Sequence, residues 1–357
     1  MSESILSPKA SSQYIAETSK DVTICSEGVA KVANLIYESV KNKSFDITNW
    51  KKHALNPKTM DVSTVDWIFV LDTMNFSFWS EDASNKYTVT YKDKAYTGYW
   101  SLCAAVNRAL DNGIPITTPA YCASISGEQL ADILKSDSNQ EIPLFSERLQ
   151  ALKQTCKIIM KKYQGSFVNC IRESDNSAEN LLQLIVNNFP SYRDEATYGS
   201  KQVSFYKRAQ ILIADIWTCF EGQSLGFFYD IEKLTMFADY RIPQILAYYG
   251  ALKYSDSLMK ILKDGVLMKN GDRLEVEIRG CSIWSVEMIR EESQKLLDED
   301  EETKNALFNS VLLDQFLWDY RQLHAKEMDV IPIHKRKSER KMQMYCILDL
   351  IANESMN

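Results

Sequence analysis

The sequence predicts a mostly α-helical protein with a small β-sheet or hairpin at about residues 66–99. Apolar residues recur at the spacing of one helix face through most of the chain, as at Val29, Val32, Ile36 and Val40 in segment 26–42. Alternating β-branched and aromatic residues, the pattern of strands, gather in residues 66–99. Helices are therefore expected to build the bulk of the fold, with one short β region added to them.

The boundaries of the expected elements follow from capping and turn residues. Ser126 and Gln129 form a capping box before an apolar run, and Gly165 ends a helix that begins near Phe145. The run 67–71 is typical of a buried strand, and 87–91 and 94–98 flank a two-residue turn as a hairpin. Further helices are expected at 177–189, 207–221, 243–249, 255–264, 281–296 and 310–327.

The composition is that of a globular protein without a surface for long nucleic acid. The chain has 357 residues, of which 45% are hydrophobic and 25% charged, and a formal net charge of -7. A net negative charge argues against binding of long nucleic acid but allows a small anionic ligand in a local basic pocket. The acidic run 298–302 is expected in an exposed loop.

Cysteine and histidine usage predicts no metal site and no cofactor. The eight cysteines show no CxxC pair, and the histidines are His53, His324 and His334. We expect reduced cysteines and a cytoplasmic protein. No segment has the roughly 20 apolar residues of a membrane span, and the start MSESILSPKA lacks the apolar core of a signal peptide.

The stretch TMFADYRIPQ (235–244) places two opposite charges, Asp239 and Arg241, inside an apolar run. Pro243 suits the first turn of a helix and Gly250 suits its end, so Asp239 lies just before a helix. The positive end of the helix dipole favours the ionised form of a carboxyl group in that place. Asp239 is therefore either a helix cap or a catalytic carboxylate.

A second candidate lies in YKRAQILIADIW (206–217). On a helix, Lys207, Ile211 and Asp215 share one stripe, and the other faces are apolar. Buried charges need a partner or a ligand. The stripe is either an internal ion-pair network or the wall of a polar pocket.

A third candidate combines aromatic and polar residues at 72–79 and 98–101. Asp72 and Asn75 are interleaved with Phe76 and Trp79, and Trp100 follows. A heterocyclic base needs flat faces to stack on and polar groups at its edges, which this set offers. The alternative is an aromatic core with Asp72 capping a turn.

Two further positions are weaker candidates. The alternating charges of Glu275-Val276-Glu277-Ile278-Arg279 are more typical of an ion-pair ladder than of a site. His53 is either a group that handles phosphate or protons, or a surface histidine at the end of a short helix.

Several stretches together resemble the queuosine 5′-phosphate N-glycosylase/hydrolase family, the queuosine salvage proteins. The resemblance runs from about residue 5 to about residue 334, with the motifs in the same order. The motifs are FVLDTMNFSFWSE (69–81), YTGYWSLCAAVNRALDNGIPIT (96–117), SFVNCIRES (166–174), NFPSYRDE (188–195), SFYKRAQILIADIW (204–217), TMFADYRIPQILAYYGALKYSD (235–256) and GDRLEVEIRGCSIW (271–284).

The resemblance implies hydrolysis of queuosine 5′-monophosphate to release the base queuine, for salvage into tRNA modification. It implies a helical architecture like that of the helix-hairpin-helix DNA glycosylases, with Asp239 at the catalytic aspartate position and Lys207 at an active-site lysine position. A non-catalytic nucleoside-binding protein, a DNA-repair glycosylase and a helical interaction scaffold are the alternatives. The expected partner is the small-molecule substrate, without long nucleic acid, membrane or an obligate protein partner.

Residue chemistry supplies the remaining expected roles. Asp72 and Asn75 would bind the base edge and Phe76, Trp79 and Trp100 its face, while Asp215, Glu277 and His53 complete the substrate-binding set. Lys207 and Arg241 are the nearest cations for the 5′-phosphate, although Arg241 could instead pair with Asp239 or Glu277.

The chain is expected to form one catalytic unit over residues 1–334. Residues 1–125 would hold the small sheet and the base-binding motifs, and residues 126–334 the catalytic motifs. Residues 335–357 form a divergent basic tail, either solvated or a localisation or phosphate patch.

Overall fold

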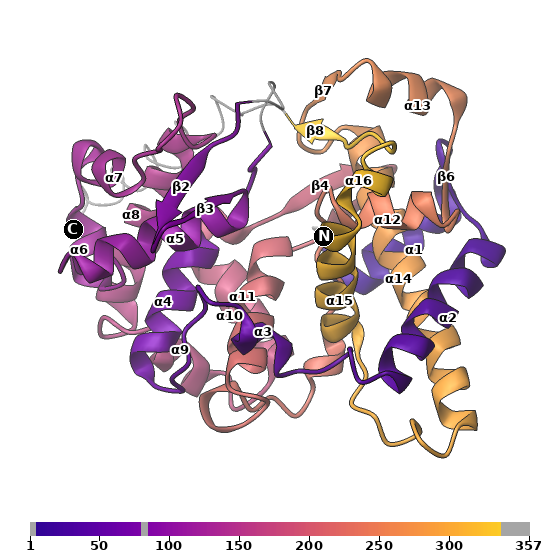
Figure 1. Cartoon of the computed structure of the whole chain (residues 1–357), viewed down its shortest axis with the longest axis horizontal. Helices are drawn as coiled ribbons and strands as arrows, with labels where there is room; N and C mark the ends of the chain where they lie inside the picture. The colour runs from indigo at the N-terminus through magenta and orange to yellow at the C-terminus, as the bar shows by residue number, and fades with distance from the viewer. Residues whose placement is uncertain (1–4, 80–84, 337–357) are drawn as a thin grey trace.

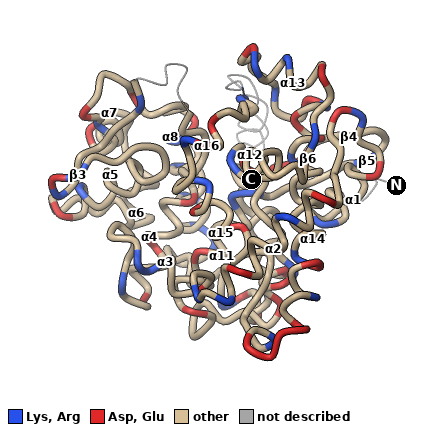
Figure 2. Tube along the Cα trace, turned by 45° about the vertical axis from the view of Figure 1, so that its right-hand side comes forward, with Lys and Arg blue, Asp and Glu red and all other residues tan. Residues whose placement is uncertain are grey.

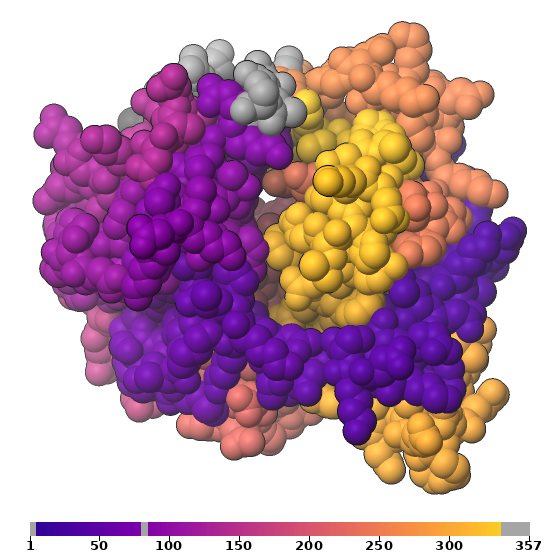
Figure 3. All heavy atoms as spheres, in the orientation of Figure 1, coloured from indigo at the N-terminus to yellow at the C-terminus, as the bar shows by residue number. Residues whose placement is uncertain are grey.

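The computed structural model describes residues 5–79 and 85–336, which form two helical lobes with a cleft between them (Figures 1 and 3). The fold is mostly helical with small pairs of strands, as the sequence predicts. Within these residues, no helix combines the length and hydropathy needed to cross a membrane. The cysteines of this part of the chain are free thiols, and all but Cys25 are buried.

The first lobe is built on helices from the middle of the chain. α4 and α11 cross its core, which holds Phe69, Phe167, Phe189 and Leu212 among other fully buried side chains. Its elements are α3 (Asn49–Lys52), α4 (Val62–Thr73), β2 (Thr88–Tyr91), β3 (Lys94–Thr97), α5 (Tyr99–Asp111), α6 (Pro119–Ser124), α7 (Gly127–Ile133), α8 (Phe145–Lys162), α9 (Val168–Glu173), α10 (Ala178–Asn188) and α11 (Lys207–Cys219), with 3₁₀ turns at Pro190–Tyr192, Ser224–Gly226 and Ile231–Lys233.

The second lobe joins the two ends of the described chain around one long helix. α14 packs against α1 and α2, and the contact is close because Gly280 faces Ile15. Its elements are α1 (Pro8–Thr18), β1 (Val22–Ile24), α2 (Ser26–Lys41), β4 (Glu195–Tyr198), β5 (Lys201–Ser204), α12 (Ile242–Tyr248), β6 (Leu252–Tyr254), α13 (Asp256–Lys263), β7 (Leu267–Met268), α14 (Arg273–Glu299), α15 (Ser310–Leu323), α16 (Ala325–Met328) and β8 (Lys335–Arg336).

The two hydrophobic cores do not divide the chain at residue 125. The first core draws on residues 55–237 and on 311–312, and the second on 15–40, 198–205 and 236–328. The chain therefore begins in the second lobe, builds the first and returns. Of the basic tail, residues 335–336 are described, as strand β8 parallel to β7, and the rest of 335–357 lies outside the described residues.

The expected strand at 67–71 is wrong, because these residues lie within α4. Every residue from Thr64 to Thr73 except Asp66 is buried, so the helix has no polar face that would mark its period. Asp61 begins the helix as its cap, accepting a hydrogen bond from the N–H of Thr64. The β region at 66–99 is therefore reduced to the β2–β3 hairpin, which pairs Thr88 with Thr97 as expected.

The expected helices with one apolar face are confirmed. Segments 26–42, 145–163, 177–189, 207–221, 243–249 and 255–264 are α2, α8, α10, α11, α12 and α13, and the Ser126–Gln129 capping box begins α7. Segment 310–327 is divided into α15 and α16, and α14 begins at Arg273, before the expected 281. Figure 2 shows acidic residues of the 298–302 run gathered where α14 ends and its loop begins.

Further pairs of short strands among the described residues were not predicted. β1 pairs with β6, β4 with β5 and β7 with β8, in pairs of two to four residues each. Such short runs are too brief to carry a recognisable alternation.

Candidate active site

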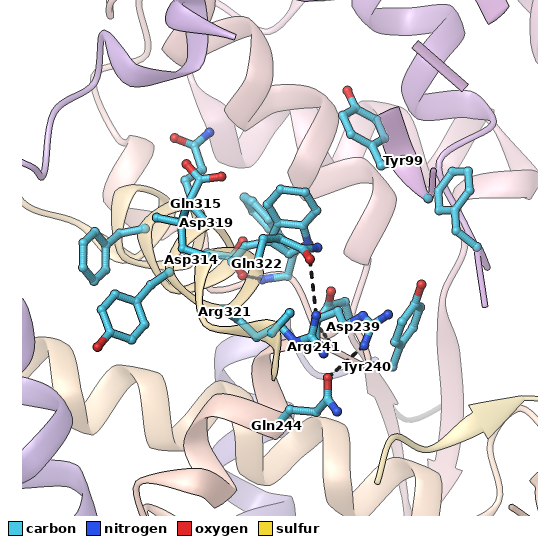
Figure 4. A pocket seen from close by; sticks show the side chains of 18 of the residues that line it. Tyr99, Asp239, Tyr240, Arg241, Gln244, Asp314, Gln315, Asp319, Arg321 and Gln322 are labelled. Atoms are coloured by element: carbon cyan, nitrogen blue, oxygen red, sulfur yellow. Dashed lines mark hydrogen bonds between the residues drawn. The ribbon is translucent and has the colours of Figure 1, made fainter. Parts of the chain in front are cut away.

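A cavity of about 1370 Å³ lies between the two lobes. The first lobe supplies Asn75, residues 77–79, the start of α5 and one face of α11, and the second supplies residues of 237–244, α15 and 331–335. Figure 3 shows the hollow between the first lobe and α15, and Figure 4 shows its side chains from close by. The space is ample for a nucleotide-sized ligand.

Asp239 lies in this cavity just before α12, at the place expected from the sequence. Its Oδ1 accepts hydrogen bonds of 2.8 Å from the N–H of Arg241 and of Ile242, so it caps the helix. Burial raises the pKa of Asp239, while Lys207 and the two N–H groups lower it. The helix start thus favours the ionised form as expected, but burial outweighs it.

Lys207 faces the same cavity from the other lobe, as the first residue of α11. Its Nζ donates to the backbone oxygen of Asn75 at 3.5 Å. Burial lowers the pKa of Lys207, and the carboxylate of Asp239 is the main influence that opposes this. The two charges therefore act on each other across the cavity.

The Lys207 stripe of α11 lines the cavity, as the polar-pocket alternative anticipated. Ile211 and Asp215 lie along the wall beside Lys207. Burial raises the pKa of Asp215 well above its usual range, and nearby Asp72 adds to the effect. Burial therefore favours the neutral form of the Asp215 carboxyl group, and a neutral carboxyl group can donate a hydrogen bond to a ligand.

Asp72 lies behind the cavity wall rather than in it. It is 1% exposed, its Oδ1 accepts from Asn75 at 3.1 Å, and its Oδ2 has no hydrogen-bond partner. Burial raises the pKa of Asp72 to about 7. Asn75 itself lines the cavity, so Asp72 orients the amide that a ligand would meet.

The expected aromatic residues divide into two groups. Trp79 and Trp100 line the cavity, and the ring of His53 stacks on Trp100 with centroids 3.4 Å apart. Burial lowers the pKa of His53 to about 4, so this ring is neutral and offers a flat face. Phe76 does not line the cavity, because it lies between the guanidinium groups of Arg148 and Arg208.

Glu277 also lies away from the cavity. It accepts hydrogen bonds from the N–H of Asp21 at 2.8 Å and from the hydroxyl of Tyr198 at 3.0 Å, and it pairs with Arg273. Arg241 is not a partner of Glu277, because the guanidinium of Arg241 donates to Gln244 at 3.0 Å. Glu277 is a structural residue of α14.

Comparison with known proteins identifies the family of this chain. Residues 55–339 match the family model described as queuosine salvage protein. The chain belongs to this family. A relative from Mus musculus, named queuosine 5′-phosphate N-glycosylase/hydrolase, is 50% identical over 93% of this chain and 98% of its own length. Relatives with the same name from Nematostella vectensis and Sphaerobacter thermophilus are 42% and 33% identical, over 95% and 91% of this chain and 99% and 94% of their own lengths.

This member of the queuosine salvage protein family uses α15 as a cavity wall, which the sequence analysis missed. Asp314, Gln315, Asp319 and Arg321 line the cavity (Figure 4). The Oδ1 of Asp314 accepts from the N–H of Phe237 at 2.9 Å, and burial raises its pKa well above the usual range. A buried aspartate in the apolar run SVLLDQFLW was the available signal, but the run is equally typical of an amphipathic helix.

Proposed function

We propose that this protein hydrolyses the N-glycosidic bond of queuosine 5′-monophosphate and releases queuine for salvage into tRNA modification. The observation that carries the proposal is the placement of Asp239 and Lys207 on opposite lobes of one nucleotide-sized cavity. The relatives named queuosine 5′-phosphate N-glycosylase/hydrolase, which match nearly their whole length, support the same substrate.

Asp239 is suited to stabilise the charge that forms on the sugar. Breaking the C1′–N9 bond leaves positive charge on C1′ and the ring oxygen, and the electron pair departs with the base. A fixed carboxylate beside C1′ stabilises that charge before water adds to C1′. Both N–H groups before α12 hold Asp239 in place for this role.

Two buried carboxyl groups of the cavity, Asp215 and Asp314, complement Asp239 on the side of the base. The departing nitrogen gains electron density and requires a proton or strong hydrogen-bond donors. Burial favours the protonated forms of Asp215 and Asp314, and in this form each can donate toward the base edge. Trp100 with the stacked His53 offers a face for the flat ring, and Asn75 an amide for its edge.

The proposal also includes the domain organisation and the architecture of the protein. We infer one catalytic unit over 1–334, since both lobes line the cavity, and an architecture like that of the helix-hairpin-helix DNA glycosylases. The mostly helical fold and an aspartate at a helix start support this architecture. Action on a free nucleotide in the cytoplasm would need no long nucleic acid or membrane surface.

Base release from purified protein tests the proposal. Queuosine 5′-monophosphate, queuosine and guanosine 5′-monophosphate are incubated separately with the protein, and the free base is followed by chromatography. We expect release of queuine from the monophosphate, a lower rate from queuosine, and little guanine. Tight binding of the monophosphate without release would instead identify a nucleotide-binding protein and refute hydrolysis.

A further inference from the structure

Two arginine side chains meet at one carboxylate oxygen on the cavity wall beside Asp239. Arg241 Nη1 lies 3.9 Å from Asp329 Oδ1, and Arg321 Nη2 is bonded to the same oxygen. Arg241 comes from the segment before α12, Arg321 from the last turn of α15, and Asp329 follows α16. Figure 4 shows the two guanidinium groups next to each other and to Asp239.

Within the described part of the chain, the arginine pair, Arg241 with Arg321, has a single carboxylate, that of Asp329, as its direct ion-pair partner. Besides Asp329, Arg241 donates to the neutral oxygen of Gln244 and Arg321 to that of Gln322. The side chain of Asp329 is 61% exposed, so water weakens the pairing that it provides. Two cations therefore share one solvated anion as their direct partner, and the other carboxylate that acts on both of them is Asp239.

Arg321 carries the sharper signal of a ligand. It is 2% exposed and lines the cavity, yet its Nε has no hydrogen-bond partner. A buried N–H group of a charged side chain is costly to leave unpaired. Burial and the neighbouring charge of Arg241 both lower the pKa of Arg321, which is the expected result of an incomplete anion site.

We propose that the arginine pair is the subsite that binds the 5′-phosphate of the nucleotide, and that Asp329 occupies part of it in the absence of phosphate. This inference rests on the proposed function. Planar guanidinium groups bind phosphate oxygens through two parallel hydrogen bonds, and two of them together match a dianion. Phosphate would replace Asp329 as the partner of both groups.

Because Arg241 lies two residues after Asp239, phosphate bound by this subsite would affect the reaction at C1′. The N–H of Arg241 donates to Asp239 Oδ1 at 2.8 Å, so the phosphate-binding side chain and the carboxylate share one short segment. A phosphate held there fixes the ribose with respect to Asp239. Binding energy from the phosphate is thereby used to orient C1′.

Two other cations of the cavity already have partners. Lys207 Nζ donates to Asn75 and faces the carboxylates of the cavity, while Lys335 Nζ lies over the ring of Trp79, 5.5 Å from its centroid. Among the described residues, Arg321 is the one cation with a buried side-chain N–H that lacks a partner.

The test compares the nucleotide with the nucleoside in variants that remove one guanidinium each. In Arg321→Gln and Arg241→Gln, we expect the ratio of kcat/KM for queuosine 5′-monophosphate over queuosine to fall about 10- to 100-fold. Arg290→Gln is the matched control for Arg241→Gln, because the side chains of Arg290 and Arg241 are 28% and 26% exposed and Arg290 pairs with Glu287 away from the cavity. An equal loss on both substrates would overturn the subsite and assign the arginines a structural role.

Binding of inorganic phosphate gives a readout independent of turnover. Calorimetry with the wild type should detect phosphate binding that Arg321→Gln weakens by at least about tenfold. Asp329→Asn removes an exposed competitor, so it should fold normally and bind phosphate several-fold more tightly. Equal or weaker binding by Asp329→Asn would refute the role of Asp329. Failure of the wild type to release base from either substrate would refute the proposed function instead.

Discussion

Replacement of Asp239 by asparagine removes one charge and leaves the local structure in place. Both helix-start hydrogen bonds end on Oδ1, and an amide oxygen accepts them equally well. Because burial raises the pKa of Asp239, the charged form is the costly one for folding. Asp239→Asn should therefore be as stable as the wild type or slightly more stable.

The expected loss of activity follows from the charge that Asp239 offers to C1′. A unit charge about 4 Å from the developing cation is worth about 4 kcal/mol at an effective dielectric constant of about 20. That difference in activation free energy corresponds to about a 10³-fold lower rate. Lys207, which faces the same cavity, is retained in the variant, but it loses the carboxylate that opposes the lowering of its pKa by burial.

Single-turnover release of queuine from the monophosphate measures this loss directly. Asp61→Asn is the matched control, because Asp61 also caps a helix, accepting from Thr64 at 3.1 Å, but does not line the cavity. Wild-type activity should also decline as the pH falls through the raised pKa of Asp239, since the carboxylate becomes protonated. If Asp239→Asn retains more than about a tenth of the wild-type rate while folded, the electrostatic argument fails.

Three further substitutions test the packing around the site. Burial raises the pKa of Asp72 to about 7, so the folded state holds this proton more tightly than the unfolded chain and the wild type loses stability as the pH rises through 7. In Asp72→Asn, the free energy of unfolding should fall by about 2 kcal/mol less than in the wild type between about pH 5 and pH 8. Urea titrations at several pH values measure this difference. Gly280→Ala would place a methyl group 2.6 Å from carbons of Ile15, and should lower the free energy of unfolding by about 1–3 kcal/mol. Arg148→Met leaves three carbonyl groups without their donor and removes the guanidinium group that packs on Phe76. The free energy of unfolding should therefore fall by about 3 kcal/mol or more. Activity should be lost on nucleotide and nucleoside alike.

Sequence patterns predicted the helices in which the periodicity of apolar residues matches the face that is buried in the folded protein. Helices with one solvated face, such as α2 and α8, carry their period in the sequence. The pattern failed at α4, which is buried on nearly every side, and at the start of α14, where Glu275, Glu277 and Arg279 are charged yet fully buried. Charged residues such as those at the start of α14 are typical of an exposed segment, but the tertiary fold buries them.

The candidate site was predictable where a charge interrupts an apolar run. Lys207, Asp215 and Asp239 stand out in this way, and all three line the cavity. Phe76 does not line the cavity, and the sequence does not show that Arg148 packs on it from α8. The cavity wall formed by α15 depends on how the two lobes meet, and no local pattern reports that contact.

The charged stretch at the start of α14 connects the two halves of the site. The buried guanidinium of Arg279 donates to Asp194 at 2.5 and 2.9 Å, and to the carbonyl of Ala238, next to Asp239, at 3.1 Å. Asp194 in turn accepts from the N–H of Lys207 at 3.2 Å. A buried ion pair adds little net stability but fixes geometry, since its removal leaves an unpaired charge. The ion-pair ladder expected from the sequence is thus also the element that holds Asp239 and Lys207 in register across the two lobes.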